Sequence, residues 1–267
     1  MSRKPFLPAV TTMAGAPLLT LLHPRRSIRP LLILFALGLA LGGVLITQVG
    51  MPLWGATTIA MGLVLFPAVQ KWRDDLARWG MPIMVLSILL ALQGFHTVEH
   101  IAQFVEYHVL GWQAKASSGL ISAANVEWIH FAWNWSVLLI VGYLMTVGRM
   151  RNLWAWALLL WATAHTLEHT YLFIRYLSTV RLLAAQGVST SFAQGLPGIL
   201  GRDGWLAATG VEQPGLALVC RLAPPLITAI RLDVHFWWNV GETVLLFAAA
   251  HRYVRQTRSD APWPTHD

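Results

Sequence analysis

Residues 96–100 read His-Thr-Val-Glu-His and residues 165–169 read His-Thr-Leu-Glu-His, so four of the five positions are identical. The two motifs lie in long apolar runs, 81–102 and 153–174. At about 100° per residue, the first, fourth and fifth positions of each motif share one face of a helix. The duplication therefore predicts two equivalent helices, each with two histidines and a glutamate on one side.

A second motif is duplicated in the apolar runs that follow. Residues 130–134 read His-Phe-Ala-Trp-Asn and residues 235–239 read His-Phe-Trp-Trp-Asn, again with four of five positions identical. Because the motifs recur in the same order, we expect two copies of one helical hairpin. Copies that cross a membrane in the same direction are related by a pseudo-two-fold axis along the membrane normal. Two such hairpins close most simply as a four-helix bundle.

The composition places these helices in a membrane. Hydrophobic residues make up 56% of the 267 positions and charged residues only 12%, whereas soluble domains are about 25% charged. A helix needs about 20 mostly apolar residues to cross a hydrocarbon core of about 30 Å. We therefore predict an all-α integral membrane protein with six transmembrane helices, at 31–50, 52–70, 81–102, 128–147, 153–174 and roughly 234–250.

The distribution of positive charge predicts the orientation of the chain. The net charge is +7, and basic residues precede the first span and follow the second, fourth and sixth spans. Between the third and fourth spans the only basic residue is Lys115. The longer connection between the fifth and sixth spans holds Arg181, Arg202, Arg221 and Arg231, but long loops carry less weight in the positive-inside rule. We predict a bacterial cytoplasmic membrane protein with both termini in the cytoplasm.

The predicted organisation has five parts. In chain order they are a cytoplasmic or interfacial segment (1–30), a two-helix transmembrane hairpin (31–80), a first repeat (81–148), a second repeat (152–254) and a cytoplasmic tail (255–267). The second repeat contains an extracytoplasmic loop, 182–228, which is rich in Gly, Pro, Ser and Thr but also apolar in part. Long loops are often functional, and the apolar content favours a lid over the bundle.

Each helix of the two repeats carries a single polar stripe. Ionisable side chains are costly inside a membrane and face the bundle interior, where they are functional candidates. We expect the four stripes to meet in the middle-to-outer part of the bilayer. The predicted metal ligands are His96, Glu99, His100, His130, His165, Glu168, His169, His235 and Glu242. The residues expected to support them are Glu127, Asn134, Asn239, Tyr107 and Tyr176.

The residue types of these stripes suit a transition metal. Imidazole and carboxylate together favour iron, copper, zinc or manganese. Cys220 is the only cysteine, which excludes an internal disulfide, a CxxC pair and a cysteine-rich metal site. Carboxylates would offset the charge of a cation in a low dielectric, and the other polar groups would orient the imidazoles. The duplicated pattern fits one ion per repeat, or a dinuclear centre on the axis.

The leading functional prediction is a membrane metalloprotein, an oxidoreductase that acts on a small or lipophilic substrate at a metal able to activate oxygen or water. Two alternatives stay open. Paired histidines could hold haem b in an electron-transfer subunit, or the chain could be a cofactor-free assembly subunit, in either case beside other membrane subunits. A His/Glu pathway could also serve a proton-coupled transporter. The lipid bilayer is the expected environment, no nucleic-acid partner is expected, and no catalytic residue is assigned.

Overall fold

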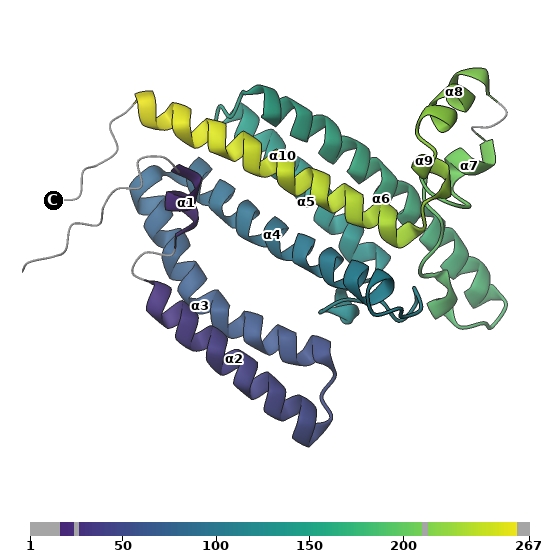
Figure 1. Ribbon diagram of the computed structural model, residues 1–267, viewed down its shortest axis with the longest axis horizontal. Coiled ribbons are helices and arrows are strands. Elements are labelled where there is room, and N and C mark those ends of the chain that lie inside the picture. The colour runs from purple at the N-terminus through teal and green to yellow at the C-terminus, as the bar shows by residue number, and fades with distance from the viewer. Residues whose placement is uncertain (1–16, 24–26, 210–212, 261–267) are drawn as a thin grey trace, which may run out of the picture.

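The computed structural model describes residues 17–23, 27–209 and 213–260. Helix makes up 80% of the structure, and the described ranges contain no strand (Figure 1). The helices are α1 (Pro17–Leu22), α2 (Ile28–Val49), α3 (Leu53–Trp79), α4 (Met81–His108), α5 (Glu127–Thr146), α6 (Leu153–Ala185), α7 (Trp205–Thr209), α8 (Pro214–Leu222), α9 (Pro225–Thr228) and α10 (Arg231–Asp260). Two short 3-10 helices, η2 (Ser122–Ala124) and η3 (Thr190–Ala193), lie in the connections. The all-α prediction is confirmed, while 1–16 and 24–26 of the expected N-terminal segment and 261–267 of the expected tail lie outside the described residues.

Four helices, α2, α3, α4 and α5, are long and apolar enough to cross a membrane. The outer surface of α2 carries large apolar side chains that are more than half exposed, such as Leu32, Ile33 and Leu39. Such a surface suits lipid rather than water. The helices α6 and α10 are longer still, at 33 and 30 residues, but carry more polar and charged residues, so length and composition alone do not place them in a membrane.

The four helices that carry the duplicated motifs run alongside one another (Figure 1). α10 packs against both α4 and α6, and α5 packs against α6. The direct contact between α4 and α5 is less extensive. The polar stripes of all four helices therefore share one interior.

The interior of this four-helix group is apolar toward the end where α4 begins and α5 ends. Leu86, Leu90, Leu144, Leu158 and Leu246 are at most 2% exposed and belong to one continuous core. Close packing of such side chains leaves few voids large enough for water. The histidines lie beyond this apolar layer, so the polar groups are confined to one part of the interior.

The short helix α1 closes the apolar end of the interior. It packs against α4 and α10, and its Leu18 and Leu21 are buried within the same core. The part of the N-terminal segment that the structure describes is therefore attached to the four-helix group.

The hairpin of α2 and α3 packs against the four-helix group through α3 and α4 (Figure 1). Within the hairpin, Gly38 and Gly42 of α2 meet Ala60 and Ala56 of α3. These small residues allow the two backbones to approach closely, which is a common way for helices to associate in lipid. At the other end of α3, Lys71 donates hydrogen bonds to Asp75 and to Ser87 of α4.

The connection between α6 and α10 differs from the expected loop at 182–228. α6 continues as far as Ala185, because 182–185 are leucines and alanines that favour helix and the first glycine comes at Gly187. The rest folds into η3, α7, α8 and α9, which gather near the end where α10 begins (Figure 1). Backbone hydrogen bonds from Gly201 to Leu226 and from Arg202 to Ala229, each 2.7 Å, hold this connection together.

Gly38→Ala should weaken the α2–α3 hairpin. A Cβ at Gly38 would lie 2.8 Å from the Ala60 Cα, whereas a Cβ at Gly43 of the same helix would meet nothing within 4 Å. Overpacking of this kind costs about 1–3 kcal/mol. Thermal unfolding in detergent should show a lower midpoint for Gly38→Ala and no loss for Gly43→Ala. Equal midpoints would contradict the close contact.

Candidate metal centre

Six histidines from four helices form one group in the polar part of the interior. Neighbouring imidazoles have ring centroids 4.7 to 6.2 Å apart, and these contacts connect all six. They are His96 and His100 of α4, His130 of α5, His165 and His169 of α6, and His235 of α10. We call this group the histidine centre. It brings together every histidine that the sequence predicted as a metal ligand.

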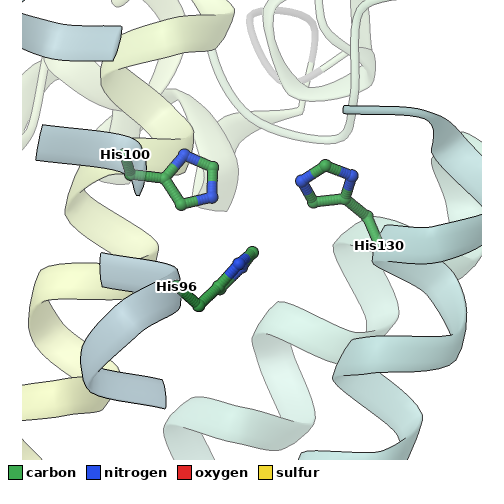
Figure 2. Close-up of side chains that lie close together, drawn as sticks. All are labelled: His96, His100 and His130. Atoms are coloured by element: carbon green, nitrogen blue, oxygen red, sulfur yellow. The ribbon is translucent and has the colours of Figure 1, made fainter. Parts of the chain in front are cut away.

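Three of these side chains meet especially closely. His96, His100 and His130 each offer a ring nitrogen, and the three nitrogens lie within 4.8 Å of one another. Figure 2 shows His100 and His130 facing each other from α4 and α5, with His96 beside them. A metal–imidazole bond is about 2.0–2.1 Å long, so small side-chain shifts would bring the three nitrogens into reach of a single ion.

Six ring nitrogens of the centre are buried without a hydrogen-bond partner among the described residues. The Nε2 atoms of His96, His100, His165 and His235, and both ring nitrogens of His169, have no hydrogen-bond partner among the described residues. Buried polar atoms in proteins are almost always paired, because an unpaired one loses its hydration without compensation. Several unpaired nitrogens at one place form a donor set whose lone pairs could hold a bound group.

Hydrogen bonds to the helix backbone set the tautomer of two histidines. The Nδ1 atom of His130 lies 3.1 Å from the Val126 carbonyl oxygen, and that of His235 lies 2.9 Å from the Arg231 carbonyl oxygen. A carbonyl oxygen only accepts, so Nδ1 donates in both rings. In a neutral imidazole this leaves a lone pair on Nε2, which is the form that binds a metal.

Side chains set the tautomer of two more histidines. His100 donates from Nδ1 to the Gln103 Oε1 atom at 3.0 Å. His165 donates from Nδ1 to the Glu242 Oε2 atom at 2.7 Å. Metal-binding histidines usually donate their second ring N–H to a carboxylate or a carbonyl oxygen, which fixes the ring and raises its basicity.

Two asparagines and a glutamine support the histidine centre. Asn134 and Asn239 donate to the carbonyl oxygens of His130 and His235, both at 2.9 Å. Gln93 is fully buried and accepts a hydrogen bond from the Trp133 Nε1 atom at 3.1 Å. The sequence prediction did not include Gln93 or Gln103, although each lies three residues from a histidine on the α4 polar stripe.

The glutamates of the duplicated motifs bind the chain segments that connect α4 to α5 and α6 to α10. Glu99 accepts hydrogen bonds from the backbone N–H groups of Leu120 and Ile121, both at 2.9 Å. Glu168 accepts from the backbone N–H groups of Ile199 and Leu200, at 3.0 and 3.3 Å. Both carboxylates therefore act as anchors for a connection next to the centre, rather than contacting an imidazole.

Glycines make room for these two carboxylates. A Cβ at Gly119 would collide with Glu99, and a Cβ at Gly198 would collide with Glu168. The two connections read Gly-Leu-Ile at 119–121 and Gly-Ile-Leu at 198–200. This similarity is a sequence signal that could have identified the two anchored segments in advance.

The remaining supporting residues lie around the edge of the centre. Glu127 forms an ion pair of 2.6 Å with Arg231, which also donates to the Leu196 carbonyl oxygen. Tyr107 contacts His108, and Tyr176 contacts Phe173. Glu127 thus joins the starts of α5 and α10, while both tyrosines pack against rings outside the histidine centre.

Comparisons of the chain with protein-family models, with curated proteins and with solved structures found no match.

Glu168→Gln should release the segment 198–200, and Glu99→Gln should release 119–121. Glutamine keeps one acceptor oxygen but turns an NH2 group toward a backbone donor. Hydrogen bonds to a charged group contribute about 1.5–3 kcal/mol, so amide exchange in the affected segment should become about 10- to 100-fold faster. Hydrogen exchange followed by mass spectrometry measures both segments at once, and each variant is the control for the other. Unchanged exchange in a variant's own segment would contradict the anchoring role.

Proposed function

We propose that this chain is a polytopic membrane metalloprotein whose histidine centre binds a transition metal in a metal-dependent oxidoreductase. The observation that carries the proposal is the group of His96, His100 and His130, whose ring nitrogens lie within 4.8 Å of one another. Burying such a group without a ligand would leave several nitrogens unpaired, at a cost of about 1–3 kcal/mol each. A metal ion would offset this cost directly.

The donor atoms favour a metal that prefers imidazole. Zinc, copper and iron accept several histidine nitrogens, whereas magnesium and calcium prefer oxygen. The single cysteine, Cys220, lies in α8 and is not part of the histidine centre. Soft thiolate chemistry is therefore not part of the proposal. Iron and copper among these metals would supply the redox chemistry of an oxidoreductase, by activating oxygen at the metal.

The packing of the imidazoles favours a small ion over haem. Each histidine of the centre has another imidazole within 4.7 to 6.2 Å. The flat ring of a haem would need an open slot between the two histidines that bind its iron. Around any two histidines of the centre, other imidazoles occupy that space. Haem in an electron-transfer subunit is therefore the weaker reading.

The apolar half of the interior favours a closed metal site over a proton path. A pathway across the membrane needs polar groups or water along its whole length. Between the histidine centre and the end where α4 begins, the interior is filled by Leu86, Leu90, Leu144, Leu158 and Leu246. A site reached from one side only is the simpler interpretation.

We propose that α6 and α10 cross the membrane beside the four apolar spans, which gives six spans with both termini in the cytoplasm. The packing of α10 between α4 and α6 supports this arrangement. The repeated motifs also make equivalent contacts. The ring centroids of His96 and Trp133 are 5.1 Å apart, and those of His165 and Trp238 are 5.2 Å apart. The two repeats would then form a parallel pair within one bundle.

The exposure of His96 supports a lipophilic substrate. Its side chain is half-buried, whereas the other five histidines are at most 7% exposed. His96 lies beside Trp133 between α4 and α5, which make the least extensive contact of the neighbouring helices in the four-helix group. On the outer side, Glu99 and Glu168 hold two chain segments near the centre. A molecule dissolved in the bilayer would therefore approach laterally, past His96.

His100→Ala should lower the metal content of the purified protein by at least one equivalent. Elemental analysis by plasma mass spectrometry measures the metal, and an optical spectrum of the same sample tests for haem. His108→Ala is the matched control, because His108 lies on the same helix but pairs with Asp233 at 2.7 Å outside the centre. This variant should keep the full metal content.

Two outcomes would overturn the proposal. Wild-type protein that contains no metal, after reconstitution with iron, copper, zinc and manganese, would leave the imidazoles as a polar network. A Soret band would assign the centre to haem and to electron transfer.

A further inference from the structure

We infer that the second repeat holds a metal site of its own, built from His165, His169 and His235 and made chemically distinct by the carboxylate of Glu242. This inference rests on the proposed function, because it concerns the same histidine centre. It assigns two unlike metal ions to the centre, the first bound by imidazoles alone and the second bound beside a negative charge.

The histidines of the second group are deeply buried and are connected through His169, although their ring nitrogens meet less closely than those of the first group. Ring centroids are 5.0 Å apart for His165 and His169, and 4.9 Å apart for His169 and His235. The three side chains are 0%, 1% and 6% exposed. Each has a buried Nε2 atom with no hydrogen-bond partner among the described residues. Three unpaired donor atoms thus lie outside the group of His96, His100 and His130.

Glu242 distinguishes this second group from the first. It is 1% exposed, and its Oε2 atom accepts the hydrogen bond from His165 Nδ1 at 2.7 Å. Its other oxygen, Oε1, is buried and has no partner within the described part of the chain. A carboxylate oxygen in that state is costly unless a cation or a donor lies nearby.

The first repeat has no carboxylate at the equivalent position. Glu242 lies seven residues beyond His235, and Val137 lies seven residues beyond His130. The Nδ1 atom of His100, which is equivalent to His169, meets the neutral amide of Gln103. The first site therefore offers neutral imidazoles, whereas the second adds one negative charge and a more basic His165.

The two sites would act on one substrate. His130 of the first group stacks on His169 of the second, with ring centroids 5.3 Å apart and planes 11° apart. Centres with two metals can hold both reacting groups of a substrate at once. The negative charge favours the more highly charged ion at the second site, so the two metals would differ in affinity and in redox behaviour.

In the test, Co²⁺ is added stepwise to the full-length protein, which has been purified in detergent and stripped of metal. The optical bands and the amount of bound metal are measured at each step. Wild-type protein should bind two equivalents in two steps. His100→Ala and His169→Ala should each keep one equivalent. Glu242→Gln should weaken one step about 10- to 100-fold and leave the other unchanged. Glu106→Gln is the control, because Glu106 binds the Gly119 N–H at 2.9 Å and contacts no imidazole of the centre.

The outcomes separate this inference from the proposed function. Binding of one equivalent that both histidine variants abolish would show a single shared site, which overturns the inference and leaves the proposed function standing. No binding to wild-type protein would overturn both. Two steps that Glu242→Gln leaves unchanged would overturn the role of the carboxylate, even if either histidine variant failed to fold.

Discussion

The structure depends on burying six imidazoles within a group of helices that is otherwise apolar. An unpaired nitrogen in such surroundings is costly. The chain pairs the Nδ1 atom of four of the six rings, and in His100, His165 and His235 the Nε2 atom has no hydrogen-bond partner among the described residues. Backbone carbonyls fix His130 and His235, whereas Gln103 and Glu242 fix His100 and His165. The result is a set of lone pairs that converge, which is the arrangement that a metal ion requires.

The same constraint explains the connections at the outer end. Glu99 and Glu168 would be buried charges without partners if the segments 119–121 and 198–200 did not supply backbone N–H groups. Each interaction satisfies a carboxylate and also two backbone donors that would otherwise need water. The glycines at both positions permit this approach because they lack a Cβ. These contacts hold both segments beside the helices that carry the histidine centre.

The two repeats have similar motifs but unlike surroundings. Val137 and Glu242 occupy equivalent positions, and Gln93 and Gln103 of α4 correspond to Ala162 and Leu172 of α6. The side chain that accepts a hydrogen bond from a histidine of α4 therefore lies on α4 itself, whereas the one that accepts from a histidine of α6 lies on α10. Such differences between duplicated halves allow one centre to hold two chemically distinct environments.

The sequence by itself determined the helical class, the presence of helices long and apolar enough to cross a membrane, and which six histidines share the polar stripes. Hydropathy and helical period are local properties that survive in any arrangement of the chain. It did not determine which polar residue meets which. Glu99 and Glu242 look alike in sequence, yet one binds a loop backbone and the other an imidazole. Gln93 and Gln103 carried no signal beyond their place on a polar stripe. These differences arise from the packing of α10 against α4 and α6 and from the path of the connections. Only the tertiary structure decided them, because they depend on contacts between residues far apart in the chain.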